Sequence, residues 1–417
     1  MKTIMASLLF VFGSVGSSVA QDDSSSEQQH TQYPFIVQDS PDGLFTMRQV
    51  DQDYLSGFRL FSKVTNENLN PTLSYSIQAV ACLLAFKTFT HEEAHRSILV
   101  GEGIGSVTHP FLFSKGGGMV TGVTDQTLKN LRDTKFPTYI RLHTAGFESD
   151  YMLATREETL LSLEDETYKN LFIDYLFRKA ALIGYFAMGI FKHDIDEAEE
   201  PDELQRDIVG NDFYGVIRHL HRPAMEFKRY TRYEDLTGEE LHYMGRLESR
   251  TFLNLLNANL IGVRNFRITD KLSLNAGMGH CMGPFGDFID EKFWFVYKGK
   301  MKINAYVREF QNRENWFPGA GVGISRYPIT KRIEVSVNTH VWKQPLNLGF
   351  NEKEGKTGGA VDVAASCNLL KKPKSQLKSF SLELGMIWKS AGFLPEEIVL
   401  DEHLGFRFGF GIGFGAR

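Results

Sequence analysis

Cysteine is scarce in this chain. The 417 residues include three cysteines, Cys82, Cys281 and Cys367, which are odd in number and far apart, so no disulfide framework is implied. An excess of positive charge is also lacking, because 46 lysines and arginines stand against 51 aspartates and glutamates and give a net charge of −5. The sequence therefore has no basic footprint for nucleic acid, and we expect no nucleic-acid partner.

A nucleotide-binding loop is lacking as well. The run Lys-Gly-Gly-Gly-Met-Val at 115–120 is rich in glycine, but no Gly-Lys-Ser/Thr triplet follows it. We interpret it as a flexible turn and expect no nucleotide partner. The apolar stretch 171–191 is interrupted by Asp174, Arg178 and Lys179, so it is predicted to be a core helix rather than a membrane span.

The first twenty residues have the three parts of a secretory signal peptide. Lys2 gives the basic start, residues 8–12 the apolar part, and Ser18-Val19-Ala20 a small-residue cleavage site. The apolar part is too short to span a bilayer, so we expect cleavage and export. Residues 21–69, which open with a run of Asp, Ser, Glu and Gln, are expected to be a polar, partly disordered segment.

What the chain does contain is His91-Glu92-Glu93-Ala94-His95 within a strongly helical stretch. Residues four apart share one helix face, so His91 and His95 can present two imidazoles to one metal ion. Glu92 points off that face, where it can reach a water molecule on the metal. A charged surface turn would give the same residues, but the flanks at 77–86 and 98–100 are apolar on nearly all sides. They predict a buried helix and favour a metal site.

The motif resembles that of the zincin metallopeptidases, in which two histidines bind zinc and the glutamate activates water. The metzincin continuation fails, because Gly105 stands where its histidine would be. In the gluzincin branch a glutamate on a second helix is the third ligand, and the stretch 145–150 (Ala-Gly-Phe-Glu-Ser-Asp) resembles the turn that carries it. The resemblance covers about a quarter of the chain. It implies Zn²⁺ on His91, His95 and Glu148, with Asp150 orienting an imidazole.

Other residues compete for these roles. Glu102, His109 and His143 are rival third ligands within reach in the sequence. Peptide hydrolysis also needs a donor for the oxyanion, and His143 and Tyr151 are candidates for it. The remaining histidines that we considered are predicted to be structural; they are His219, His221, His242 and His280.

Beyond about residue 260 the hydrophobic period changes from helical to two. From Leu404 to Phe414 large apolar residues alternate with glycine or arginine over eleven residues, which suits a tilted membrane-spanning strand. About nine strands are predicted, at 260–268, 271–280, 291–298, 300–310, 318–327, 333–341, 361–369, 380–388 and 404–414. A soluble sandwich or cup would alternate in the same way, with its apolar face inward. Polar residues on the opposite face and aromatic residues near strand ends favour a membrane.

This part of the chain resembles the outer-membrane β-barrels of diderm bacteria. We therefore expect an α+β multidomain protein, with an α-helical zincin-like domain at 70–258 and an antiparallel, membrane-type β-barrel of eight to ten strands at 259–417. The expected function is a zinc metallopeptidase at the bacterial outer membrane, with its helical domain in the periplasm and a peptide or protein as substrate. The alternatives are a non-enzymatic barrel with a helical plug, and a degenerate peptidase that binds metal without turnover.

Overall fold

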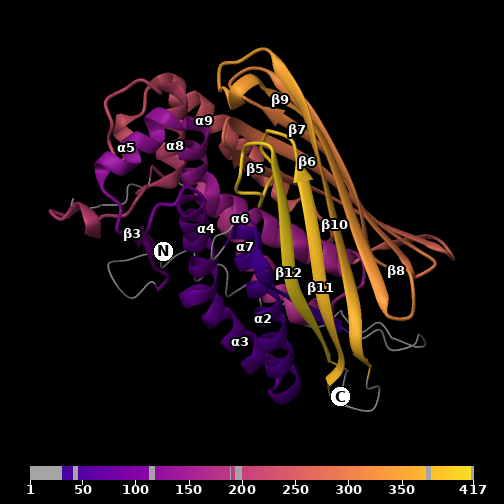
Figure 1. The fold of residues 1–417 in the computed structure, drawn as a ribbon. Helices are drawn as coiled ribbons and strands as arrows, with labels where there is room; N and C mark the ends of the chain where they lie inside the picture. The colour runs from indigo at the N-terminus through magenta and orange to yellow at the C-terminus, as the bar shows by residue number, and fades with distance from the viewer. Residues whose placement is uncertain are drawn as a thin grey trace.

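The computed structural model describes residues 31–40, 46–111, 118–187, 189–192, 200–371 and 377–414. The chain forms a helical region followed by a large antiparallel sheet (Figure 1), so the α+β layout is confirmed. The expected signal peptide at 1–20, the polar stretch 21–30 and residues 115–117 of the glycine-rich run lie outside the described residues.

The helical region is built from long helices that pack on one another. They are α2 (Met47–Asn68), α3 (Pro71–Ala81), α4 (Lys87–Gly101), α5 (Asp125–Thr134), α6 (Phe136–Ser162), α7 (Tyr168–Ala187), α8 (Asp212–His221) and α9 (Gly238–Thr251). Short elements join them, including the π-helical turn η1 (Cys82–Phe86), the 3-10 turns η2 (Glu203–Gln205), η3 (Tyr233–Asp235), η4 (Phe252–Leu255) and η5 (Ala258–Ile261), and the hairpin β2 (Val107–His109) and β3 (Met119–Thr121). A further 3-10 turn, η6 (Leu346–Leu348), lies between strands.

The predicted helix at 70–100 is confirmed as one continuous rod made of α3, η1 and α4. Asn70 caps its start by accepting a hydrogen bond from the backbone of Leu73, and Pro71 occupies the first turn, where a missing N–H costs nothing. The wider turn η1 rotates α4 relative to α3, because an extra residue in a turn shifts the helix face. As a result α4 is buried, whereas Ile77, Val80 and Leu83 are exposed on the outer side of the rod. The prediction that the whole helix is buried is therefore wrong for α3 and η1.

Ten strands form one antiparallel sheet in the order β1-β12-β11-β10-β9-β8-β7-β6-β5-β4. Neighbours are consecutive in sequence except at β1, as expected for strands joined by short turns. The strands are β1 (Thr31–Asp39), β4 (Phe266–Thr269), β5 (Leu272–Gly283), β6 (Gly286–Tyr297), β7 (Met301–Gln311), β8 (Trp316–Pro328), β9 (Ile333–Pro345), β10 (Gly355–Lys371), β11 (Leu377–Lys389) and β12 (His403–Phe414).

Strand β1 corrects the prediction of a partly disordered segment at 21–69. Thr31–Asp39 pairs with β12, and Phe35 lies opposite Phe410 with the two rings stacked at 5.3 Å. Aromatic cross-strand pairs stabilise a sheet, and Met47–Asn68 of the same segment forms α2. The polar residues before position 31 dominate the composition of this segment, so composition did not indicate the strand and the helix that follow them.

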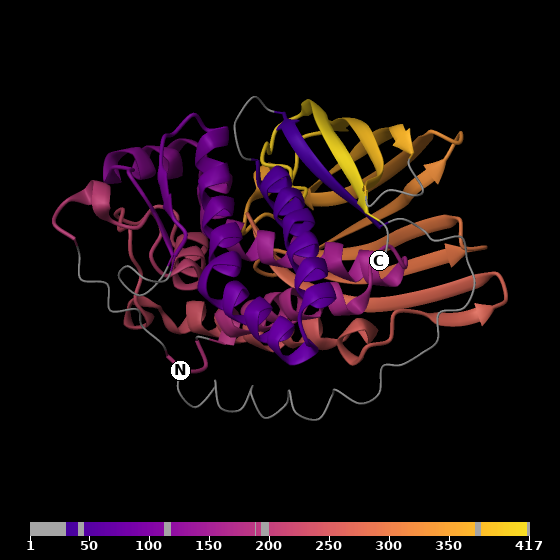
Figure 2. The same cartoon turned by 90° about the horizontal axis from the view of Figure 1, so that it is seen from below.

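The alternation of the strands places the apolar side chains outward. Leu404, Phe406 and Phe408 of β12 are exposed, Phe406 to 58 %. The opposite side of the sheet faces the helices (Figures 1 and 2), and Asp290 on that side accepts a hydrogen bond from Tyr151 of α6. This is the reverse of a soluble cup, in which the apolar residues point inward.

The sheet is not closed into a barrel, so that part of the prediction is wrong. Its end strands, β1 and β4, do not pair with each other, and other groups bond to free backbone atoms at both edges of the sheet. At β1 the side chain of Gln49 donates to the Ile36 carbonyl at 3.1 Å, and that of Gln52 donates to the Pro34 carbonyl at 3.2 Å. At the other edge β4 pairs only with the first residues of β5. Further along β5, the backbone N–H of Met278 donates to the Leu256 carbonyl at 2.8 Å.

The two predicted domains share a hydrophobic core. One cluster of buried side chains includes Phe147, Phe186 and Phe213 from helices together with Phe288 and Phe310 from the sheet. Helix α6 connects the layers, because it contacts α4 and α8 on one side and β5 and β6 on the other. Residues of the site on α4 and α6 are thus held by a rigid, close-packed interior.

Candidate metal centre

Helix α4 presents the two histidines of the motif on one face. The ring centroids of His91 and His95 are 5.0 Å apart. The Nε2 atoms of these rings lie 3.2 and 3.4 Å from the same oxygen, Oδ2 of Asp212 at the start of α8. One ligand atom from each of these three buried residues lies within 4.8 Å of the others. The cluster is small enough to surround one metal ion.

The second nitrogen of each imidazole, Nδ1, contacts an oxygen atom outside the cluster. His95 Nδ1 lies 2.6 Å from the Leu142 carbonyl, which can only accept, so this nitrogen carries the proton. His91 Nδ1 lies 3.3 Å from Oδ2 of Asp150. The Nε2 atoms of both rings face the Asp212 carboxylate. Burial would lower the pKa of both imidazoles, but their carboxylate contacts raise it, that of His95 to about 10. Without a metal His95 is therefore protonated near pH 7 and donates from Nε2 to Asp212, and a metal ion would replace that proton.

The buried Asp212 carboxylate requires positive charge beside it, which protonated imidazoles supply in the absence of a metal and which a bound cation would supply in their place. Oδ1 of Asp212 is buried and has no hydrogen-bond partner. Burial alone would raise the pKa of Asp212, but the imidazoles of His95 and His91 overcome this and hold that pKa well below its usual range. The carboxylate is thus ionised, and the donor set of two imidazoles and one carboxylate fits zinc.

Asp150 connects the centre to the protein interior. Its second oxygen accepts a hydrogen bond from Arg178 of α7 at 2.6 Å, and the same guanidinium donates to Thr90 at 2.5 Å. Burial would raise the pKa of Asp150, but the His91 and Arg178 contacts hold it below its usual range. Asp150 therefore lies beside the imidazole that it was predicted to orient.

Glu148, the predicted third ligand, does not reach the centre. It forms an ion pair with Arg141 at 2.5 and 3.0 Å and accepts the backbone N–H of Glu396 at 2.6 Å. The stretch 145–150 is not a turn but the middle of α6, a helix of 27 residues. Residues 146 and 150 share the face toward α4, whereas position 148 lies about 200° around the helix from 146. The structure therefore does not bring Glu148 to His91 and His95, and Asp212 lies beside the two imidazoles instead.

The rival third ligands are engaged elsewhere. Glu102 pairs with Lys135 at 2.6 Å, and His109 Nε2 contacts the Thr121 hydroxyl at 2.9 Å. His143 is fully buried between α6 and α8, and its ring nitrogens have no hydrogen-bond partner. Burial lowers the pKa of His143 to about 4, so it is neutral near pH 7.

Tyr151 is also far from its predicted role as an oxyanion donor. Its hydroxyl donates to Asp290 of β6 at 2.6 Å, and Asp290 is held in turn by Arg308. Tyr151 follows Asp150 directly, so its side chain points about 100° away around α6 and faces the sheet. The structure does not bring Tyr151 to the cluster, for the same helical reason as Glu148.

Glu92 lies at the centre without belonging to the ligand set. Its side chain is nearly buried, and its charge interacts with His91, His95 and Asp212. The backbone of Gly118 passes so close that a Cβ there would overlap the Glu92 carboxyl group. Glu92 is therefore confined beside the two imidazoles, as a proton acceptor for water at the metal must be.

Tyr185 is a further residue beside the cluster, and no motif or spacing in the sequence points to it. Its ring stacks on His91 with the centroids 4.9 Å apart and an interplanar angle of 7°, and its hydroxyl lies 3.3 Å from His91 Nε2. Lys87 Nζ lies 4.8 Å from the centroid of the same ring. Tyr185 thus presents its hydroxyl to the same nitrogen of His91 that faces Asp212.

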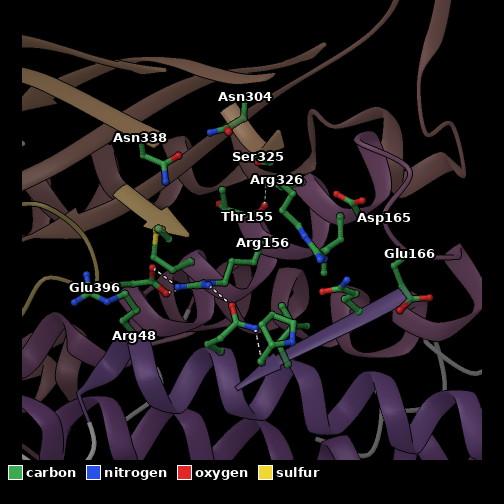
Figure 3. A pocket seen from close by; sticks show the side chains of 18 of the residues that line it. Arg48, Thr155, Arg156, Asp165, Glu166, Asn304, Ser325, Arg326, Asn338 and Glu396 are labelled. Atoms are coloured by element: carbon green, nitrogen blue, oxygen red, sulfur yellow. Dashed lines mark hydrogen bonds and ion pairs between the residues drawn. The ribbon is translucent and has the colours of Figure 1, made fainter. Parts of the chain in front are cut away.

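A separate cavity of about 1000 Å³ lies between the helices and the polar face of the sheet. Figure 3 shows Asn304, Ser325 and Asn338 of the sheet across the cavity from Arg48 and Arg156 of the helices. None of the described residues that line it is a member of the metal cluster. The part of the inward side of the sheet that lines this cavity is therefore largely polar, whereas Phe288 and Phe310 of the same sheet belong to the hydrophobic core.

The fold and the cluster define a protein with a candidate two-histidine, one-aspartate metal centre beside a large open sheet. Comparison with models of known families and with curated proteins gave no match to this chain.

Proposed function

We propose that this protein is a zinc-dependent hydrolase of the metallopeptidase type, with His91, His95 and Asp212 as ligands. The observation that supports this most directly is the convergence of both Nε2 atoms on one carboxylate oxygen, with both Nδ1 atoms already bonded. Three protein ligands of this kind leave a fourth position for water or substrate in catalytic zinc sites. The resemblance of residues 91–95 to the zincin motif points to the peptide bond as the substrate.

The residues around the cluster suit this chemistry. When bound, zinc supplies a Lewis acid that polarises a carbonyl group and makes water acidic near neutral pH. Glu92 takes a proton from water and returns it to the nitrogen of the leaving amine. Tyr185 donates its hydroxyl proton in a hydrogen bond to the oxygen of the attacked carbonyl as negative charge develops there.

We also propose that the outer face of the sheet anchors the protein in the bacterial outer membrane. Its exposed apolar side chains lie on adjacent strands, and a strand of twelve residues such as β12 is long enough to cross the hydrocarbon layer. The residues are Val322, Ile324, Ile333, Val341, Val361, Leu384, Met386, Trp388, Leu404, Phe406 and Phe408. The polar inward face and the export signal expected at 1–20 support this placement, with the metal centre on the periplasmic side.

The test of the enzymatic proposal is a combined measurement of zinc content and peptide hydrolysis. Wild-type protein should hold about one zinc per chain and cleave members of a peptide library. The Glu92→Gln variant should keep its zinc and lose about two to four orders of magnitude in rate, because an amide cannot accept the proton. Glu102→Gln, which alters the ion pair with Lys135 outside the centre, is the control and should retain both properties.

Two results would overturn the proposal. Wild-type protein without a bound transition metal would leave the second candidate, a non-enzymatic membrane protein whose helices cover the polar face of the sheet. Zinc without turnover of any peptide would show a metal-binding protein that has lost or never had peptidase activity.

A further inference from the structure

The opening between the two end strands of the sheet is bridged by a series of contacting elements. Helix α2 contacts β1, α3 contacts α2, α7 contacts α3, and η4 contacts both α7 and β5. The wall that begins as sheet is thus continued by helices until it returns to the sheet. We refer to α2, α3, η1, α7, η4 and η5 as the helical seam.

The helix α3 of this seam has its polar side inward. Ser74 and Gln78 are fully buried, and the Gln78 amide donates to Thr65 and Asn66 of α2. The opposite side exposes Leu73, Ile77, Val80 and Leu83, Val80 to 54 %. A helix at a water-facing surface instead buries its apolar side and exposes its polar side.

The neighbouring helices also bury ionisable side chains, together with apolar ones such as Leu55 and Phe58 of α2 and Ile173 and Leu182 of α7. Helix α2 buries Asp51, Ser56 and Arg59 while Val64 is exposed and Leu60 is half-buried. Helix α7 buries Asp174, Arg178 and Lys179, while its phenylalanines Phe172 and Phe177 are half-buried. Ionisable residues that face inward and apolar residues that face outward are the rule in membrane-embedded helices.

Length and charge fit a bilayer as well. The sixteen residues of α3 and η1, Pro71–Phe86, contain no charged side chain. They are about 24 Å long, close to the apolar band of about 25 Å in membrane barrels. The rod Pro71–Gly101 is long and apolar enough to cross a membrane, and only 22 % of its most apolar window is buried, whereas α4 at the end of the rod is buried.

The far end of the seam completes the apolar surface. Phe252, Leu255 and Leu256 at η4 are exposed beside the edge of β5, and Ile261 of η5 is exposed to 79 %. Phe266 and Ile268 of β4 continue this surface into the sheet. Exposed apolar residues are therefore present on the sheet, on the seam and at both junctions.

We propose that the helical seam faces lipid together with the outer side of the sheet, so that the protein crosses the bilayer as a wall made partly of strands and partly of helices. This inference rests on the proposed membrane anchoring and extends it to the helices. It also places the metal centre near the membrane, because His91 follows Phe86 by five residues in the same rod, about 8 Å along the axis.

The test is photo-crosslinking of the full chain in phosphatidylcholine vesicles, with p-benzoylphenylalanine placed at one position at a time. Val80 probes the seam, Phe406 the sheet, and Lys129, an exposed residue of α5, serves as the polar control. Adducts with acyl chains, measured by mass spectrometry, should form at Val80 as at Phe406, about tenfold above Lys129. Leu73 is a second seam position if the Val80 variant fails to fold.

The outcomes separate the two proposals. Adducts at Phe406 but not at Val80 or Leu73 would overturn the lipid-facing seam and leave the sheet as the membrane anchor. Adducts at none of these positions would overturn the membrane anchoring itself, and the seam proposal with it. The zinc and hydrolysis measurements are independent of either result.

Discussion

Gly146 of α6 lies directly against the imidazole of His91 of α4, so close that a Cβ at position 146 would overlap the ring. Helix α4 packs on α6 at this point, and glycine permits the approach because it has no side chain. The same approach brings Asp150, one turn further along α6, to His91 Nδ1. The geometry of the metal centre therefore depends on a residue that contributes no atom to it.

We predict that Gly146→Ala displaces His91 and weakens zinc binding by about one to two orders of magnitude, as expected when the support of a ligand is disturbed. The measurement is a zinc titration with a competing chelator. Gly245→Ala on α9, where a Cβ meets no atom within 4 Å, is the control and should bind zinc as the wild type does. An unchanged affinity in Gly146→Ala would show that α4 can shift without loss of the site.

Asp212 and Glu148 are expected to respond oppositely to removal of their charge. Asp212→Asn should lose zinc, because this carboxylate is the third donor of the cluster. Glu148→Gln should keep the zinc-to-protein ratio of the folded fraction but lower the free energy of unfolding by about 3–5 kcal/mol, because it breaks a buried ion pair with Arg141. Urea unfolding and elemental analysis measure the two effects. Loss of zinc only in Glu148→Gln would return the ligand role to Glu148.

Much of this architecture could be predicted from local pattern. The capped helix that begins at Asn70 and the alternation from Leu404 to Phe414 are local signals, and both elements form as expected. The spacing of four residues within one helix also predicted correctly that His91 and His95 lie side by side. These predictions hold because they depend on neighbours within a few residues.

The failures all depend on contacts between distant segments. Asp212 lies 117 positions after His95 in the numbering, and only the packing of α8 against α6 brings it to the centre. The sheet is open, with α2 in contact with β1 and η4 in contact with β5, and the strand pattern cannot show these contacts. Glu148 was misplaced because a motif expected in a turn lies within a long helix, where a shift of two residues changes the face.

Tyr185 should affect the reaction without affecting the metal. We predict that Tyr185→Phe lowers kcat by about two to three orders of magnitude, the usual cost of removing one oxyanion donor, and leaves the zinc content unchanged. Tyr168→Phe on the same helix, a half-buried residue outside the centre, is the control for loss of a hydroxyl. Equal kcat values in wild type and Tyr185→Phe would show that the Tyr185 hydroxyl has no role in the reaction and that the ring only stacks on His91.

His143 should make the fold sensitive to acid. It is buried with no partner for either ring nitrogen, and burial lowers its pKa to about 4, against about 6.5 in an unfolded chain. Because the folded pKa is lowered, the stability tied to this residue is complete above about pH 6.5 and is lost as pH falls toward 4. The loss approaches about 3 kcal/mol below pH 4, since each pKa unit corresponds to about 1.4 kcal/mol.

The variant His143→Leu isolates this contribution, because leucine has a similar volume and cannot take up a proton. We expect little change in the free energy of unfolding at pH 7, since neither nitrogen has a hydrogen bond to lose. Between pH 7 and pH 4 the variant should lose about 3 kcal/mol less than the wild type, measured by urea unfolding at each pH. His242→Leu, at an exposed position on α9, should follow the wild-type curve. If the free energies of unfolding of His143→Leu and wild type fall in parallel as the pH is lowered, burial does not oppose protonation of His143. The protonated imidazole would then have gained water or another hydrogen-bond partner.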